Sequence, residues 1–209
     1  MKSQIRLLFA LGVLLMLPKC VLFAQPVAVG NHSFEADVLP ANGAVSGAPT
    51  SWMLSGAGGY LNGFAAQGLT PRPDGTAQNV WSNNGEFFQA LGMAVAPNTT
   101  YTLTVDVGDR SDGCCAFPLG TEIQLGSGAA LGTNYLTLTG ETRPLPNAGW
   151  QTWTSTFDSG PSPVAGPLRR DWINPGGAQP QSDNVHLEAA ATPPRGPDRF
   201  VDDCLLHDH

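Results

Sequence analysis

The chain has 209 residues, of which 42% are hydrophobic and 13% are charged; this excludes an intrinsically disordered protein, because disorder requires low hydrophobicity and high charge. Its 25 Gly and 18 Pro residues disfavour long helices, since Gly costs about 1 kcal/mol and Pro about 3 kcal/mol in a helix interior. The composition therefore favours an all-β fold of one domain.

The first 24 residues have the three parts of a secretory signal peptide. Lys2 and Arg6 supply the basic start, an apolar run covers residues 7–17, and the segment closes at Ala24 before Gln25. The apolar run is too short for a membrane anchor, because a spanning helix takes about 20 residues. We therefore expect cleavage after Ala24 and a secreted or cell-surface, extracytoplasmic protein with no membrane span in the mature chain.

The expected mature chain, residues 25–209, is acidic. It contains seven Arg, no Lys and 17 Asp and Glu residues, which gives a formal charge of −10. This balance argues against a nucleic-acid partner, because phosphate recognition needs a basic surface. It does not indicate the oligomeric state, which the sequence leaves open.

Three cysteines remain after removal of the signal: the neighbours Cys114 and Cys115, and Cys204. Adjacent cysteines rarely bond to each other, because a disulfide favours Cα atoms about 5.5 Å apart whereas consecutive Cα atoms lie about 3.8 Å apart. One of the neighbours can pair with Cys204, or can remain a small buried thiol. Both alternatives stay open.

The clearest predicted strand is Tyr101–Val107, in which every second residue is apolar. Such alternation predicts one buried and one solvated face, with Tyr101, Leu103, Val105 and Val107 in the core. Similar short runs recur between Gly, Pro and Asn residues, at Ala77–Trp81, Glu86–Val95, Thr121–Leu125, Tyr135–Thr139, Trp150–Phe157 and Val185–Ala189.

This spacing predicts an antiparallel sandwich or barrel of about eight strands. We expect residues 25–190 to form the β-sandwich domain. Residues 191–209 begin with a dense run of Pro and Gly and have no strand period, so an irregular C-terminal tail is expected there.

Three pieces of sequence, in order, resemble one family. They are Val29-Gly-Asn31-His-Ser33-Phe34-Glu35 with the following Ala48–Trp52, the hairpin from Leu91 to Gly108, and the late pair Gly149–Thr154 and Asp183–Leu187. Together they are similar to secreted jelly-roll sandwiches of the galactose-binding-like and carbohydrate-binding-module type, especially exported bacterial proteins sorted by a PEP-CTERM tail. The tail itself is not found here, and the two arginines within Leu168–Ile173 depart from the family pattern.

The resemblance also implies a structural calcium ion. In such folds the first and last strands run side by side, which would bring Glu35 of the opening motif to Asp183 of the final strand. Ca²⁺ takes about six to eight oxygen ligands, and two carboxylates with backbone carbonyls supply them. The alternative is that Glu35 caps a turn and Asp183 begins a strand, both solvated.

Aromatic residues in polar surroundings are candidates for ligand binding, because sugar rings dock on aromatic planes. Trp81 lies among Asn and Ser residues, and Tyr60 follows two glycines. Arg110 and Asp112 lie on a polar loop and are further candidates, because the planar guanidinium of Arg110 suits vicinal hydroxyl groups or a carboxylate. The alternative is a surface arginine paired with Asp109 or Asp112. The strand-like settings of Trp52, Trp150 and Trp153 predict that at least two of them, Trp150 included, pack in the core, whereas Trp172 stays unassigned.

An enzyme is not expected. The sequence has no nucleophile elbow, zinc-protease motif, phosphate loop or dinucleotide fingerprint; a paired-carboxylate glycosidase is the exception, because its two acids meet only in space. We therefore predict a secreted non-catalytic binding module whose partner is a glycan or cell-surface polysaccharide. The alternative is a structural or adhesive component of a bacterial cell surface or extracellular matrix.

Overall fold

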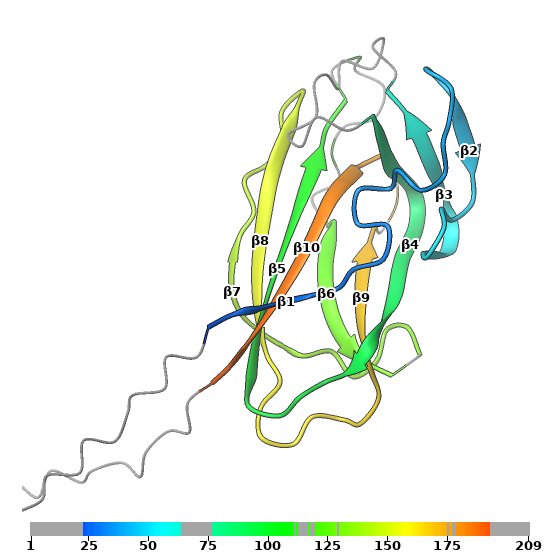
Figure 1. The fold of residues 1–209 in the computed structure, drawn as a ribbon. Helices are drawn as coiled ribbons and strands as arrows, with labels where there is room; N and C mark the ends of the chain where they lie inside the picture. Colours follow the sequence, from blue (N-terminus) through cyan, green and yellow to red (C-terminus); the bar gives the residue numbers. More distant parts are fainter. Residues whose placement is uncertain are drawn as a thin grey trace, which may run out of the picture.

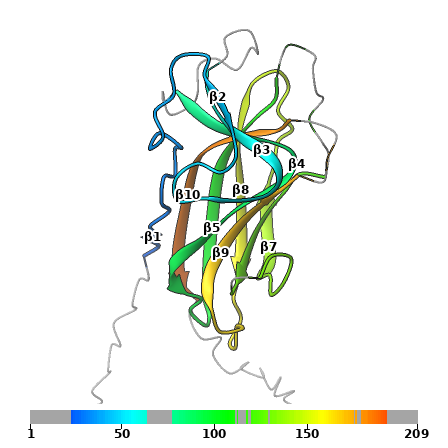
Figure 2. The same cartoon turned by 90° about the vertical axis from the view of Figure 1, so that its right-hand side faces the viewer.

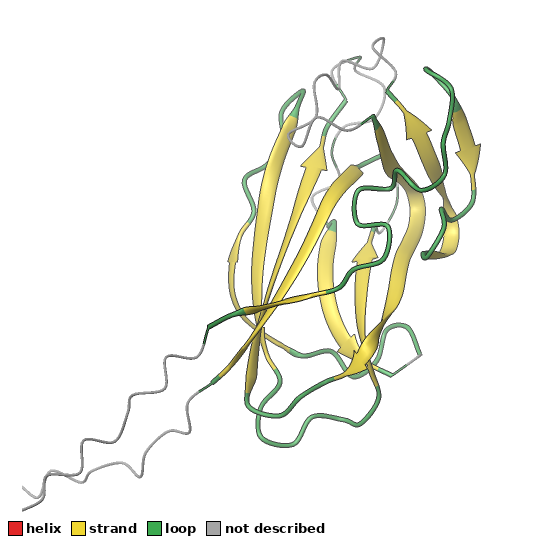
Figure 3. Cartoon of the chain, viewed as in Figure 1, coloured by secondary structure: helices red, strands yellow, loops and turns green. Residues whose placement is uncertain are grey.

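The computed structural model describes residues 23–63, 77–110, 112, 117, 120–128, 130–174, 176 and 179–192. These residues form ten strands and no helix (Figures 1 and 3). The strands are β1 (Gln25–Val27), β2 (Ala44–Ser46), β3 (Met53–Asn62), β4 (Gln78–Ala94), β5 (Thr99–Gly108), β6 (Glu122–Ser127), β7 (Thr137–Thr142), β8 (Trp150–Asp158), β9 (Pro167–Ile173) and β10 (Gln181–Ala191).

All strand pairs are antiparallel, and the main path runs β2-β3-β4-β10-β5-β8-β7. Strand β4 belongs to both layers: before Gly85 it pairs with β10, and after Gly85 it pairs with β9, which in turn pairs with β6. The layer containing β5, β8 and β10 faces the layer containing β6 and β9 (Figures 1 and 2). The predicted antiparallel jelly-roll sandwich is confirmed.

The core lies between these two layers. Tyr101, Leu103, Val105 and Val107 of β5 all face it, and none is more than 1% exposed, which confirms the predicted alternation. The other layer contributes side chains that include Phe87, Ile123, Leu125, Leu168 and Trp172. Trp52 and Trp153 lie in the core as expected, but Trp150 does not: it is half-buried on the opposite face of its strand.

The segment with two arginines is a regular strand. Strand β9 lies between β4 and β6, so both of its edges are paired. Both of its faces are covered as well, because every residue from Leu168 to Asp171 is at most 1% exposed. Alternation places Arg169 and Asp171 on one face and Arg170 with Trp172 on the other. A strand covered on both sides need not alternate apolar and polar residues, which is why its pattern looked irregular.

Strand β3 gave no sequence signal because glycines interrupt its alternation. They are needed where other groups press on the backbone: a Cβ at Gly59 would lie 2.1 Å from the Val45 carbonyl oxygen and 2.9 Å from the Trp81 ring. At Gly56 the φ angle is +90°, in the region that glycine tolerates best. These glycines would be taken for strand breakers from sequence alone.

The chain ends meet at one strand, because β1 pairs with the C-terminal part of β10 through Val27 and Leu187. Residues 1–22 and 193–209 lie outside the described residues, as do Cys114, Cys115 and Cys204. The signal peptide, the extracytoplasmic location, the tail and the cysteine pairing therefore remain predictions. Within the residues that the structure describes, no helix is long and apolar enough to cross a bilayer.

Candidate functional site

A row of side chains crosses four adjacent strands on the face that points away from the core. Trp81 of β4 pairs with Gln181 of β10, Gln181 pairs with Gly108 of β5, and Gly108 pairs with Trp150 of β8. Residues directly opposite one another project on the same face of a sheet. Because Val107 of β5 faces the core, its neighbour Gly108 and this whole row lie on the outer face. We call these four residues the tryptophan row.

The two indoles of the tryptophan row rest on glycines. A Cβ at Gly108 would lie 3.0 Å from the Trp150 ring, and one at Gly59 would lie 2.9 Å from the Trp81 ring. Trp81 therefore covers β3 and Trp150 covers β5, with Gln181 between them. Both tryptophans are half-buried, so each keeps part of its ring accessible on this face.

Two buried carboxylates lie in the next row of the same face. Asp106 of β5 and Asp183 of β10 are directly opposite each other, and they are 2% and 0% exposed. The Asp106 oxygens accept hydrogen bonds from Thr152 Oγ1 at 2.5 Å and Asn184 Nδ2 at 2.9 Å, while Asp183 Oδ1 accepts one from the Asn184 N–H at 2.8 Å. Like charges placed directly opposite repel, so the pair concentrates negative charge at this point of the outer face.

A β-bulge in β10 fixes this arrangement. The register with β5 shifts between Asp183 and His186, and Asn184 has a φ of 50°. The Asn184 side chain links Asp106 to the His186 ring, whose Nε2 lies 2.6 Å from Asn184 Oδ1. Bulges often re-aim side chains next to active sites, and here the bulge aims Asn184 along the outer face.

Further polar side chains surround the row. Asn79 is fully buried and donates a hydrogen bond from Nδ2 to Gln181 Oε1. Arg110 lies just beyond Gly108, where its guanidinium donates to both Asp112 oxygens and to the Gln179 side chain. The predicted ligand residues Arg110 and Asp112 are thus brought to the same end of β5 as the tryptophan row.

The structure separates Tyr60 from Trp81. Tyr60 pairs with Val80, which faces the core, and is half-buried against that core. Trp81 is the next residue after Val80 and therefore projects from the other face. The two aromatic residues predicted as ligand contacts do not share a surface.

Glu35 contacts the beginning of β4. Its Oε1 accepts hydrogen bonds from the backbone N–H of Ala77 at 2.8 Å and of Gln78 at 2.5 Å, and its Oε2 accepts one from Gln78 Nε2. The loop before Glu35 lies beside β10, since the Val185 N–H donates to the His32 carbonyl at 2.9 Å. Among the residues that the structure describes, no group of three His, Cys, Asp or Glu side chains could hold a metal.

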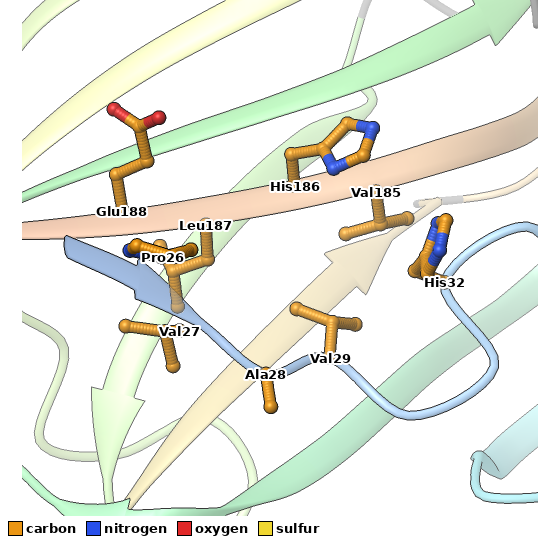
Figure 4. Close-up of a pocket in the computed structure, with 9 residues that line it drawn as sticks. All are labelled: Pro26, Val27, Ala28, Val29, His32, Val185, His186, Leu187 and Glu188. Carbon is orange, nitrogen blue, oxygen red and sulfur yellow. The ribbon is translucent and has the colours of Figure 1, made fainter.

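An apolar pocket of about 400 Å³ lies between β1 and β10. In Figure 4, Val27 and Val29 approach Leu187, whereas His186 and Glu188 project from the other side of β10. The rings of His32 and His186 lie 5.2 Å apart at its rim. Glu188 is the carboxylate among the residues that line this pocket, and in this view it points away from the apolar side chains of β1.

A charged cluster occupies the outer face of β4 and β9. Arg169 Nε donates to both Asp171 oxygens, at 2.7 and 2.9 Å. Burial and the nearby Asp171 raise the pKa of Glu86, and burial, with these two carboxylates, raises the pKa of Tyr135 to about 12. The remaining Arg169 donors bind backbone carbonyls of Gly128, Ala130 and Thr133, so this cluster fastens a loop to the sheet.

Comparison with known proteins identifies a family. A profile described as HpiC1 cyclase matches residues 25–188. A Stig cyclase, FisC from Fischerella sp. TAU in complex with (3Z)-3-(1-methyl-2-pyrrolidinylidene)-3H-indole, has a TM-score of 0.66 at 20% identity, over 81% of this chain and 100% of that one. No curated protein sequence matches.

A second solved structure, a Fischerella sp. TAU cyclase in complex with 4-(1H-indol-3-yl)butan-2-one, has a TM-score of 0.65 at 20% identity, over 81% of this chain and 99% of that one. At such identity the structural similarity shows the fold alone. Nothing in these comparisons links the chain to proteins with a PEP-CTERM tail.

The match to a cyclase family corrects the prediction of function. The prediction of a non-catalytic module binding a glycan or polysaccharide was wrong, as was the alternative of a structural or adhesive protein. The physical reason is visible in the site: no short motif carries its acids, because Asp106 and Asp183 meet only through pairing of β5 with β10.

Proposed function

Because the chain belongs to the HpiC1-like cyclase family, we propose that it is an enzyme that closes a ring in a small organic substrate. We place its active site on the outer face of the sheet that carries the tryptophan row, which we call the tryptophan face. The observation that carries this assignment is the pairing of two buried carboxylates, Asp106 and Asp183, on the same face as Trp81 and Trp150. An acid-promoted cyclisation needs a proton donor, which a carboxyl group supplies, and a surface that stabilises the resulting cation, which an aromatic ring supplies.

We propose an aromatic substrate that carries a basic nitrogen or an alkene. The two solved cyclases described above were crystallised with indole compounds, and a flat ring of that size suits stacking on one exposed indole face, that of Trp81 or of Trp150. Gln181 lies between the two tryptophans in the row, where it is fully buried and accepts a hydrogen bond from Asn79. Stacking on either indole would hold the substrate on the same face as the carboxylates.

Asp183 is the proposed proton donor. Both oxygens of Asp106 are held by side chains, Thr152 and Asn184, which makes Asp106 a positioning residue. Asp183 lies on β10, the central strand between the two tryptophans. It would protonate the substrate, the electron-poor carbon so formed would be attacked by the substrate's own π electrons, and the Asp183 carboxylate would take a proton back.

The net reaction is an isomerisation, since the proton is returned and no atom is gained or lost. The passing positive charge on the substrate would be stabilised by the indole faces of Trp81 and Trp150, because a cation over an aromatic ring gains about 0.5–2 kcal/mol. Burial of the site strengthens this attraction by excluding water.

Exchange of Asp183 for Asn tests the assignment. Asp183→Asn should lower the rate of ring closure about 10²–10⁴-fold, the usual contribution of a general acid, in a screen of indole-bearing alkenes for products of unchanged mass. Asp158→Asn is the matched control, because Asp158 lies at the opposite end of β8 and bonds only Thr100 among the described residues. Wild-type turnover by a folded Asp183→Asn variant would exclude Asp183 as the acid.

We also retain calcium as a proposed structural ion at Glu35 and Asp183. The hydrogen bonds to Glu35 leave acceptor capacity, because a carboxylate has about four lone-pair positions, and backbone carbonyls of the adjoining loop could complete the shell. A metal ligand must be ionised, whereas a proton donor must be protonated, so Asp183 cannot perform both roles at the same moment. Calcium titration of variants separates the two roles.

A further inference from the structure

Arg170 places a guanidinium in the core of the sandwich. It pairs with Gln89 on one side and Leu125 on the other, and it is 0% exposed. None of its three nitrogen atoms has a hydrogen-bond partner among the residues that the structure describes. Its contact is the face of Trp52, 4.7 Å from the ring centroid. The neighbouring Arg169, by contrast, is paired with Asp171.

An isolated buried cation is unfavourable, because its lost hydration exceeds what one aromatic face returns. Burial lowers the pKa of Arg170 to about 9, so the group is still protonated at neutral pH. Asp171 does not neutralise it directly, because Asp171 projects from the opposite face of β9 and both of its oxygens accept from Arg169. The charge requires another partner inside the sandwich.

Other groups without partners face the same interior. They come from both layers: Ser127 Oγ of β6 and Trp172 Nε1 of β9, and Ser155 Oγ of β8 and Ser182 Oγ of β10. All of these can donate a hydrogen bond. Buried polar groups nearly always have a partner, so an unpaired cation and unpaired donors that face one interior favour an acceptor group there.

The buried carboxylates of the described residues lie elsewhere. They are Asp106, Asp171 and Asp183, and each belongs to a face that points away from the interior. We propose that the core of the sandwich binds one small monoanion, a halide or a simple carboxylate, through the Arg170 guanidinium. This site is separate from the tryptophan face and rests on no step of the proposed cyclisation.

Gln89 connects the position of Arg170 with a pocket on the protein surface. It stands directly opposite Arg170 and also lines a surface pocket of about 260 Å³. Its amide closes this region by accepting from the Gly30 N–H at 3.0 Å and donating to the Gly30 and Ser51 carbonyls. A small anion that displaces this amide reaches the guanidinium without opening the sandwich.

Thermal melting at constant ionic strength tests the site. Sodium gluconate, whose anion is too bulky to enter, is the reference salt. It is replaced stepwise by sodium chloride, sodium bromide or sodium formate. A bound anion should raise the melting temperature saturably, by about 5–10 °C at a hundredfold excess over Kd. The halide and formate series distinguish an inorganic ion from a carboxylate. A melting temperature that does not respond to any of them overturns the proposal.

Arg170→Met is the decisive variant. It should lose the anion response and should melt above the wild type in gluconate, because an apolar side chain then replaces an unpaired charge. Arg143→Met is the matched control: Arg143 also lies over a tryptophan, 5.7 Å from the Trp153 centroid, but is paired with Glu141, so its variant should keep the response.

Bromide-soaked crystals of the wild type give a readout that does not depend on any variant. The anomalous signal is expected beside Arg170 and Trp52. Bromide at no interior position, together with an anion response that survives in Arg170→Met, would refute the site. An Asp183→Asn protein should bind the anion normally, so failure of the cyclase assignment would leave this result unchanged.

Discussion

At the scale of single residues, partners across the sheet determine what each side chain of the site can do. Trp150 is half-buried because Gly108 on the adjacent strand leaves room for its ring. Trp153, three residues later, faces the core, where it is 3% exposed and its Nε1 donates to the Pro144 carbonyl at 2.9 Å. Two tryptophans of one strand therefore have opposite roles.

Alanine variants should separate these roles. Trp81→Ala and Trp150→Ala should each change the free energy of unfolding by about 1 kcal/mol or less, as surface changes usually do, and should weaken binding of 4-(1H-indol-3-yl)butan-2-one about tenfold by loss of stacking. Trp153→Ala should cost about 3–5 kcal/mol as a core truncation. Urea unfolding and fluorescence titration measure both quantities. Unchanged affinity in both surface variants would remove the tryptophan row from the site.

At the scale of elements, the charged groups lie on β9, which is covered on both faces, and on the neighbouring strand β4. The outer face of β9 carries the Arg169–Asp171 pair, and β4 contributes Glu86 beside it. Glu86 is half-buried, and its Oε1 is buried without a hydrogen-bond partner among the described residues. This partial burial, together with the nearby Asp171, raises its pKa.

This raised pKa predicts a pH dependence of stability. A carboxyl group whose pKa is higher in the folded than in the unfolded chain keeps its proton longer when folded, so its contribution to stability falls as pH rises from its ordinary value of 4.5 through the folded pKa. Glu86→Gln should therefore raise the melting temperature at pH 7 and change it little at pH 4.

The control for this pH dependence is Glu122→Gln, an exposed glutamate on the neighbouring strand β6. Melting curves from pH 4 to pH 8 should show the difference between wild type and Glu86→Gln growing with pH, and no such growth for Glu122→Gln. A constant difference across this range would mean that the pKa of Glu86 is not raised in the folded protein.

At the scale of the whole molecule, the two ends of the domain close the sandwich together. Strand β1 pairs with β10, and the loop that follows it reaches the start of β4 through Glu35. The proposed calcium site lies in this closure, so the ion would stabilise the fold by joining segments far apart in the sequence.

Calcium should raise the melting temperature of the wild type by several degrees relative to EDTA, because a ligand of the folded state adds about 2.7 kcal/mol at a hundredfold excess over Kd. Glu35→Gln should abolish this shift, and Glu188→Gln, at an exposed carboxylate of β10, should keep it. A shift that persists in Asp183→Asn assigns Asp183 to proton transfer alone. Equal wild-type curves in calcium and EDTA would remove the ion.

Local pattern determined much of the fold. The alternation of Tyr101–Val107 depends only on the two-residue period of a strand, so the all-β class, the core face of β5 and the antiparallel sandwich could be read directly. Trp81 was singled out from its polar neighbours and does lie half-buried on a polar face. Asp183, Arg110 and Asp112 were also named from sequence, but Asp106 and Gln181 were not, and Trp150 was expected in the core.

Tertiary structure decided the site. Asp106 and Asp183, like Trp81 and Trp150, become neighbours only because β10 inserts between β4 and β5, and a bulge at Asn184 sets how they are aimed. Strand order and register follow from burying both layers at once, which is a property of the whole chain. For the same reason the strand character of β3 and the interior position of Arg170 were invisible in a sequence read one segment at a time.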